Sequence, residues 1–101
     1  MAEEAYYRGG SSLRPRPSEI KLDPVTGLVL PTHGVSVFNV PDNLDRFGGA
    51  YRLGEIPDKL NVIQRGRNPN HFEVVPAFSM PLREYEDALD QISLTHVGAA
   101  S

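Results

Sequence analysis

Two stretches of alternating apolar and polar residues are the clearest pattern in this chain. Gly34–Phe38 reads Gly-Val-Ser-Val-Phe, and Asn70–Pro76 reads Asn-His-Phe-Glu-Val-Val-Pro. Because successive side chains of a strand point to opposite faces, His71 and Glu73 share one face and the apolar residues between and after them face the core. We therefore predict two paired strands whose polar face, which also carries Ser36, is a candidate cleft.

Shorter extended segments are predicted on either side of these two strands, separated by Gly and Pro. Two prolines within residues 9–18 forbid regular pairing, so we expect a flexible, extended loop there. Residues 41–47 are expected to form helical turns, and residues 95–101 a fraying tail. The further segments with strand-like patterns are Tyr6–Arg8, Glu19–Leu22, Leu28–Leu30, Ala50–Leu53 and Asn61–Gln64.

One α-helix is predicted to begin near Pro81, because proline suits the first turn of a helix and Ser79 can cap it. Apolar residues then recur at helical spacing and line one face, which we expect to pack on the sheet. These residues are Leu82, Tyr85, Leu89 and Ile92. The acidic residues of the segment fall mostly on the other side, as in a solvated helix face.

Composition changes this picture in only a few respects. A length of 101 residues fits a single domain, and a net charge of −3 offers no overall electrostatic footprint for nucleic acid. The absence of cysteine excludes thiolate chemistry and is compatible with a cytoplasmic location. No apolar run approaches the roughly 20 residues that span a bilayer, and the first residues lack the features of an export signal, so no membrane contact is expected.

The order of several short motifs resembles a small family of type VI secretion toxins built on an ADP-ribosyltransferase-like fold. In that family a Gly-Thr-Ser-Val-Phe strand precedes a His-Tyr-x-x-x-Pro-x-x-x-Met strand at a similar separation. The similarity covers roughly residues 5 to 93, and each motif is short, so their order and spacing carry it. The segments that match are Tyr7-Arg8, Gly27-Leu28, Gly34–Phe38, Ile56–Val62, His71–Leu82 and Leu89.

This resemblance implies an α+β fold, with a compact, mostly antiparallel sheet, one C-terminal helix and short helical turns. It also implies an NAD-dependent activity that harms bacteria, either ADP-ribosyl transfer or NAD hydrolysis, exerted in the cytoplasm of a target cell. A toxin of this kind implies a cognate immunity protein that covers the cleft. The cytoplasmic acceptor of ADP-ribose is not indicated by the sequence.

The resemblance also implies roles for individual residues. Arg8 would contact a phosphate or ribose of NAD through its planar, permanently charged guanidinium, and Gly9 would let the ligand approach the backbone. Ser36 would order the site by hydrogen bonding, and His71 would hydrogen-bond the ribose. Glu73 would stabilise positive charge on the ribose or activate an acceptor, so Ser36, His71 and Glu73 are the candidate catalytic residues.

The chain departs from the family pattern at three positions. Val35 and Asn70 stand where the family has threonine, which removes one hydroxyl before Ser36 and another before His71. The family has no acid at the position that matches Glu73. The proposed role of Glu73 therefore rests on the shared strand face and not on the resemblance.

Two other classes of function remain open at this stage. A small ribonuclease toxin would use His71 as general acid or base, with Arg65 or Arg67 stabilising the phosphorane. A non-catalytic binding module would use the same strands only for packing. A zinc enzyme is not expected, because His33, His71 and His96 lack metal-ligand spacing.

Overall fold

The computed structural model describes residues 5–41 and 48–97 of the chain. Within them the protein is α+β, with a six-stranded antiparallel sheet and one α-helix, which agrees with the expected fold class. The expected turns at residues 41–47 lie almost wholly outside the described residues. The elements in chain order are β1 (Tyr7–Gly9), the 3₁₀ helix η1 (Pro17–Glu19), β2 (Val35–Phe38), β3 (Ala50–Leu53), β4 (Leu60–Gln64), β5 (His71–Pro76), α1 (Leu82–Asp90) and β6 (Leu94–Val97).

The sheet order is β4-β5-β2-β1-β3-β6, which places the two strands with the clearest sequence pattern side by side. β2 pairs with β5 in antiparallel register, with Ser36 opposite Glu73 and Phe38 opposite His71. The alternate residues Val35 and Val37 belong to the buried core. The predicted pairing and the predicted division into a polar and an apolar face are therefore both confirmed.

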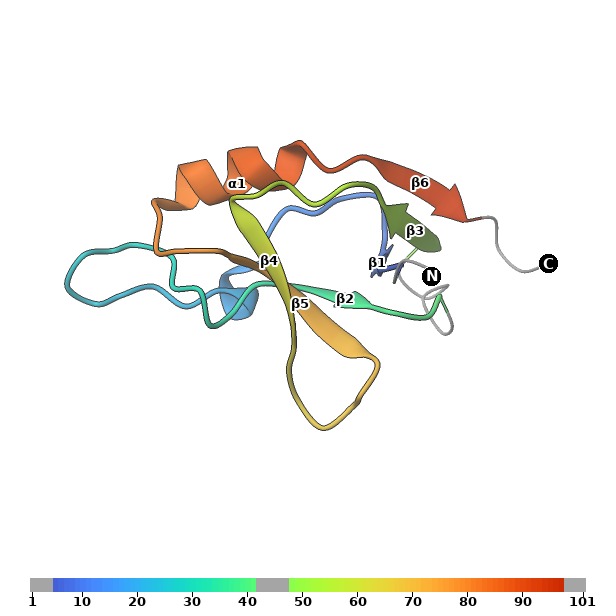
Figure 1. The fold of residues 1–101 in the computed structure, drawn as a ribbon, viewed down its shortest axis with the longest axis horizontal. Coiled ribbons are helices and arrows are strands. Elements are labelled where there is room, and N and C mark those ends of the chain that lie inside the picture. Colours follow the sequence, from blue (N-terminus) through green and yellow to red (C-terminus); the bar gives the residue numbers. More distant parts are fainter. Residues whose placement is uncertain (1–4, 42–47, 98–101) are drawn as a thin grey trace.

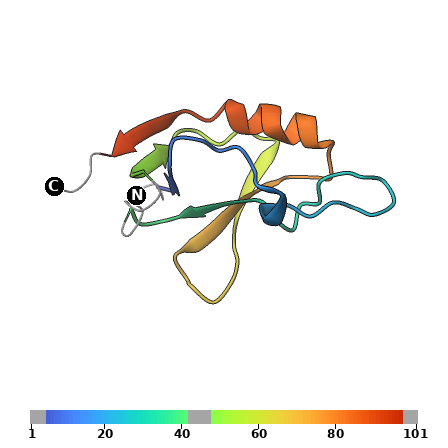
Figure 2. The same cartoon turned by 180° about the vertical axis from the view of Figure 1, so that it is seen from behind.

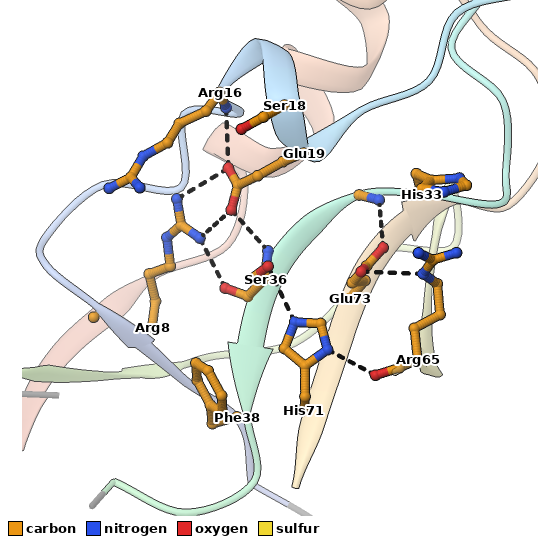
Figure 3. Close-up of a pocket in the computed structure, with 12 residues that line it drawn as sticks. Arg8, Arg16, Ser18, Glu19, His33, Ser36, Phe38, Arg65, His71 and Glu73 are labelled. Carbon is orange, nitrogen blue, oxygen red and sulfur yellow. Dashed lines mark hydrogen bonds and ion pairs between the residues drawn. The ribbon is translucent and has the colours of Figure 1, made fainter. Parts of the chain in front are cut away.

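The sheet is nearly interrupted between β1 and β2. The two strands share only one residue pair, Tyr7 with Phe38, whereas β1 pairs with β3 along three residues. Beyond that single pair the edge of β2 faces η1 and not a strand, as Figure 3 shows. This divergence opens the sheet at Ser36.

Helix α1 lies along one side of the sheet, and the loop between β4 and β5 projects away on the other side (Figures 1 and 2). Tyr85, Leu89 and Ile92 are buried as predicted, together with Ala88. Leu82 was expected on the same stripe but is 37% exposed, because it lies in the first turn, at the end of the core. No side chain caps the helix at Pro81, so the predicted cap by Ser79 is wrong.

The structure corrects three further predictions. Glu19–Leu22 does not form a strand: Glu19 ends η1, and only Leu22 makes an isolated bridge, to Val29. Residues 95–97 are not a fraying tail, because they pair with β3 as part of β6. The buried position of Leu13 in the core also ties down the segment that was expected to be a flexible loop.

Gly34, at the entrance to β2, is a point of close backbone approach. Val35 donates its N–H to the Tyr85 hydroxyl over 3.1 Å, and that hydroxyl donates to the Val74 carbonyl over 2.5 Å. The hydroxyl thus stands between β2 and β5 in place of a direct backbone bond. A Cβ atom on Gly34 would overlap the Val74 carbonyl and lie 2.8 Å from the Tyr85 hydroxyl oxygen. Only glycine fits this position without movement of the strands.

Replacing Gly34 with alanine is expected to lower the free energy of unfolding by about 3 kcal/mol, because the added methyl group must displace backbone atoms in a packed core. Chemical denaturation measures the change. Gly27→Ala is the control: its Cβ meets no atom within 4 Å, so only its left-handed backbone (φ +73°) adds a cost of about 1 kcal/mol. Equal losses in the two variants would contradict the close approach at Gly34.

Candidate functional site

A polar pocket of about 410 Å³ lies where β1 and β2 diverge (Figure 3). All five residues that the sequence analysis assigned to the site line it, although they come from separate parts of the chain. The loop after β4 and the segment around η1 supply the rest of its wall. The lining residues are Arg8, Gly9, Arg16, Ser18, Glu19, His33, Gly34, Ser36, Phe38, Arg65, His71 and Glu73.

The Arg8 guanidinium makes four hydrogen bonds to protein groups. Its Nη1 donates to a Glu19 carboxylate oxygen and to the Ser36 carbonyl, both over 2.8 Å, and its Nη2 reaches the other Glu19 oxygen at 3.3 Å. Its Nε donates to the carbonyl of Ser12 over 3.1 Å. Arg8 is only 7% exposed, so a direct contact with a ligand phosphate would require Glu19 to give way.

Glu19 completes this cluster from the other side. One of its oxygens accepts the backbone N–H of Ser36 over 3.1 Å, and the other accepts that of Arg16 over 3.0 Å. Burial alone would raise the pKa of the Glu19 carboxyl. The hydrogen bonds from Arg8 and from the two backbone N–H groups outweigh burial and hold the pKa below its ordinary value. Glu19 is therefore ionised and, with Arg8, replaces the missing strand beside Ser36.

Ser36 and His71 form a hydroxyl–imidazole pair at the floor of the pocket. The His71 Nε2 atom lies 3.1 Å from the Ser36 Oγ, and its Nδ1 lies 2.7 Å from the carbonyl oxygen of Arg65. A carbonyl oxygen only accepts, so Nδ1 carries a proton. In the neutral ring Nε2 is then an acceptor, and the Ser36 hydroxyl donates to it. This arrangement holds His71 ready to take a proton from Ser36.

Glu73 also lines the pocket, but its carboxylate is engaged in structural hydrogen bonds. Its carboxylate accepts the backbone N–H of Gly34 over 3.0 Å and the Nε of Arg65 over 3.1 Å, and the residue is 7% exposed. Its carboxylate makes no hydrogen bond to the Ser36 hydroxyl or to the His71 ring. The shared strand face was predicted correctly, but in this geometry Glu73 fixes the start of β2 and the side chain of Arg65.

Arg65 connects several parts of the site. Its carbonyl orients His71, its Nε pairs with Glu73, and its side chain is 39% exposed. Its two terminal nitrogens make no hydrogen bond with any residue in the described ranges, so they can donate to an anion. The exposed side chain of Arg16 lines the opposite part of the pocket, as Figure 3 shows.

The sequence analysis missed the place of Glu19 in the site, and it considered Arg65 only for a ribonuclease. Glu19 was assigned to a strand because Glu19–Leu22 alternates polar and apolar residues. The signal for a different structure was Pro17, which favours the first turn of a helix and places Glu19 three residues after Arg16. For the contacts of Arg65 the local sequence holds no signal, because they depend on the path of the loop after β4.

The described residues were also searched for a metal site and for a membrane-spanning helix. Among the residues it describes, no group of three or more His, Cys, Asp or Glu side chains is arranged to hold a metal ion. Within the same residues, no helix has the length and apolar character needed to cross a membrane. Comparison of the chain with protein-family models, curated proteins and solved structures finds no match.

Replacing Glu19 with glutamine is expected to lower the free energy of unfolding by about 3 kcal/mol at neutral pH, because Arg8 would stay buried without its counter-charge. Because the folded-state pKa of Glu19 lies below its ordinary value of 4.5, this stabilisation is present above about pH 4.5 and is lost as the pH falls through the lower, folded-state pKa. Denaturation curves of both proteins between pH 7 and pH 3 measure the difference.

Glu84→Gln is the matched control for this charge change. Glu84 pairs with Lys59 over 3.1 Å, but their side chains are 36% and 55% exposed. Such surface pairs contribute less than about 1 kcal/mol. A Glu19→Gln variant as stable as Glu84→Gln, or a difference from wild type that persists unchanged to pH 3, would contradict a buried, ionised Glu19.

Proposed function

We propose that this protein is an antibacterial toxin that consumes NAD, with an ADP-ribosyltransferase-like site in the pocket between β1 and β2. The observation that carries the proposal is the convergence of Arg8, Gly9, Ser36, His71 and Glu73 on one pocket. These residues come from three strands that are separated along the chain. The sheet also opens beside Ser36, which gives a ligand access to the hydroxyl–imidazole pair.

The pocket fits the size and chemistry of part of a dinucleotide. Its volume of about 410 Å³ lies within the range of about 300–1,000 Å³ for small-molecule sites. The terminal nitrogens of Arg65 and the side chain of Arg16 are suited to phosphate oxygens, and Ser36 with His71 to ribose hydroxyls. NAD supplies the reactive bond between nicotinamide and ribose.

The residues of the chain would then divide into two groups. Arg8, Glu19 and Glu73 hold the backbone at the start of β2 in place, while Ser36, His71 and Arg65 line the pocket where the ligand would bind. This division changes the expected role of Arg8 from direct contact with NAD to support of the strand that carries Ser36.

A ribonuclease activity is the second candidate, favoured by the presence of Arg65 beside His71. Cleavage of RNA by general acid–base catalysis uses two proton-transfer groups. His71 provides one, but the carboxylate of Glu73 is engaged by Gly34 and Arg65. The pocket therefore suits NAD chemistry better.

Purified protein is expected to release nicotinamide from NAD, and NAD is expected to raise its melting temperature, since a ligand that binds only the folded state stabilises it. His71→Ala should lower the rate at least about 100-fold, the usual effect of losing a proton-transfer group. Ser36→Ala should lower it as well. Chromatographic measurement of nicotinamide and thermal unfolding with and without NAD provide the test.

His96→Ala and Ser79→Ala are the controls. His96 contacts Tyr51 at the β6 edge of the sheet, and Ser79 is exposed in the loop before α1. Both should retain the wild-type rate. Absence of nicotinamide release together with an unchanged melting temperature would overturn the proposal, and degradation of RNA with intact NAD would favour the ribonuclease.

Expression of the chain in the bacterial cytoplasm is expected to stop growth, and the His71→Ala variant is expected to relieve this inhibition because the imidazole contacts the reactive pocket. Growth curves and cellular NAD content are measured together, with His96→Ala as the control. Unimpeded growth with wild-type protein present at a comparable level would point instead to a non-catalytic binding module.

A further inference from the structure

The Ser36 hydroxyl has the surroundings of an activated nucleophile. A nucleophilic serine needs a base within hydrogen-bond reach and a third group that orients the base. His71 Nε2 lies 3.1 Å from the hydroxyl, and the Arg65 carbonyl fixes the ring with Nδ1 protonated. Both Ser36 and His71 are half-buried and line the pocket, so a substrate can reach them.

The neighbouring backbone limits which electrophile Ser36 can attack. The N–H groups of Gly34, Val35 and Ser36 are bound to Glu73, Tyr85 and Glu19. None of these three is free to stabilise an oxyanion, which acyl transfer to a serine requires. Attack on the anomeric carbon of a sugar develops positive charge on the sugar instead, so it needs no such donors. The site therefore suits glycosyl transfer.

We propose that Ser36 is itself an acceptor of ADP-ribose, so that the protein modifies its own pocket. This inference rests on the proposed use of NAD. The Ser36 oxygen forms a bond to the anomeric carbon of the ribose as the bond from that carbon to nicotinamide breaks. The electron pair of the broken bond goes to the nicotinamide nitrogen, and the hydroxyl proton goes to His71 Nε2. An O-glycosidic bond to serine is stable, so the product stays attached.

Two features of the structure make the inference testable by substitution. Ser36 bonds to Arg8 and Glu19 only through its backbone, so Ser36→Ala removes the hydroxyl and leaves those contacts in place. Ser18 is a matched control, because it lines the same pocket but has no imidazole partner among the described residues. Ser18→Ala should leave the modification unchanged.

The experiment is incubation of the full chain with NAD, followed by intact-mass measurement and peptide mapping of the adduct, with nicotinamide release measured in the same sample. We expect one ADP-ribosyl group per chain, mapped to Ser36, in wild type and in Ser18→Ala, and none in Ser36→Ala. Thermal unfolding of each variant establishes that it is folded. Release of nicotinamide with no adduct, or with an adduct elsewhere, would overturn this inference and leave the proposed function standing. No release would overturn this inference, and if NAD also left the melting temperature unchanged, the proposed function would be overturned as well.

A second measurement needs no NAD. The ¹⁵N chemical shifts of the His71 ring, recorded at a pH where the ring is neutral, report which nitrogen carries the proton. We expect a protonated Nδ1 and a bare Nε2, as the Arg65 carbonyl dictates. The opposite tautomer would remove the base from Ser36 and would contradict the inference, whatever the fate of NAD.

Discussion

The backbone groups at the edge of β2 need hydrogen-bond partners that the neighbouring strand does not supply. The rest of the site depends on the side chains that supply them. β1 leaves β2 after the Tyr7–Phe38 pair, so the peptide groups of Ser36 would otherwise be unpaired. Glu19 accepts the Ser36 N–H, and Arg8 donates to the Ser36 carbonyl. The ion pair between these two side chains thus takes the place of a strand, and the sheet can open without loss of backbone hydrogen bonds.

The same solution recurs at the two preceding residues. The Tyr85 hydroxyl bridges Val35 and Val74, and the Glu73 carboxylate accepts the N–H of Gly34. Gly34 and the first two residues of β2 are therefore held by side chains from β5, α1 and η1. An unpaired buried backbone group costs about 1–3 kcal/mol, so the loss of any one of these contacts would destabilise the start of β2. They also give Ser36 a rigid position, which a site built on a strand requires.

The sequence predicted those parts of the fold that follow from local periodicity. The alternation around Ser36 and His71 placed both strands and their faces, and the helical spacing of Tyr85 and Leu89 placed α1. β6 was missed because its stability comes from pairing with β3, about forty residues earlier in the chain. The contacts of Glu19 were missed for a related reason. They depend on how the loop before η1 crosses the opened sheet, and no spacing in the sequence encodes that path.

The way β2 is held also decides which atoms of the pocket are left for chemistry. The N–H groups of Gly34, Val35 and Ser36 are hydrogen-bonded to side chains. The guanidinium of Arg8 and the carboxylates of Glu19 and Glu73 are engaged in these and neighbouring contacts. The groups left to contact a ligand include the Ser36 hydroxyl with its imidazole partner and the terminal nitrogens of Arg65. Since Arg65 orients His71 through its carbonyl and contacts Glu73 through its side chain, the loop after β4 controls both the proton acceptor and the anion-binding group. A change in that loop would alter the reactivity of Ser36 without touching the strand that carries it.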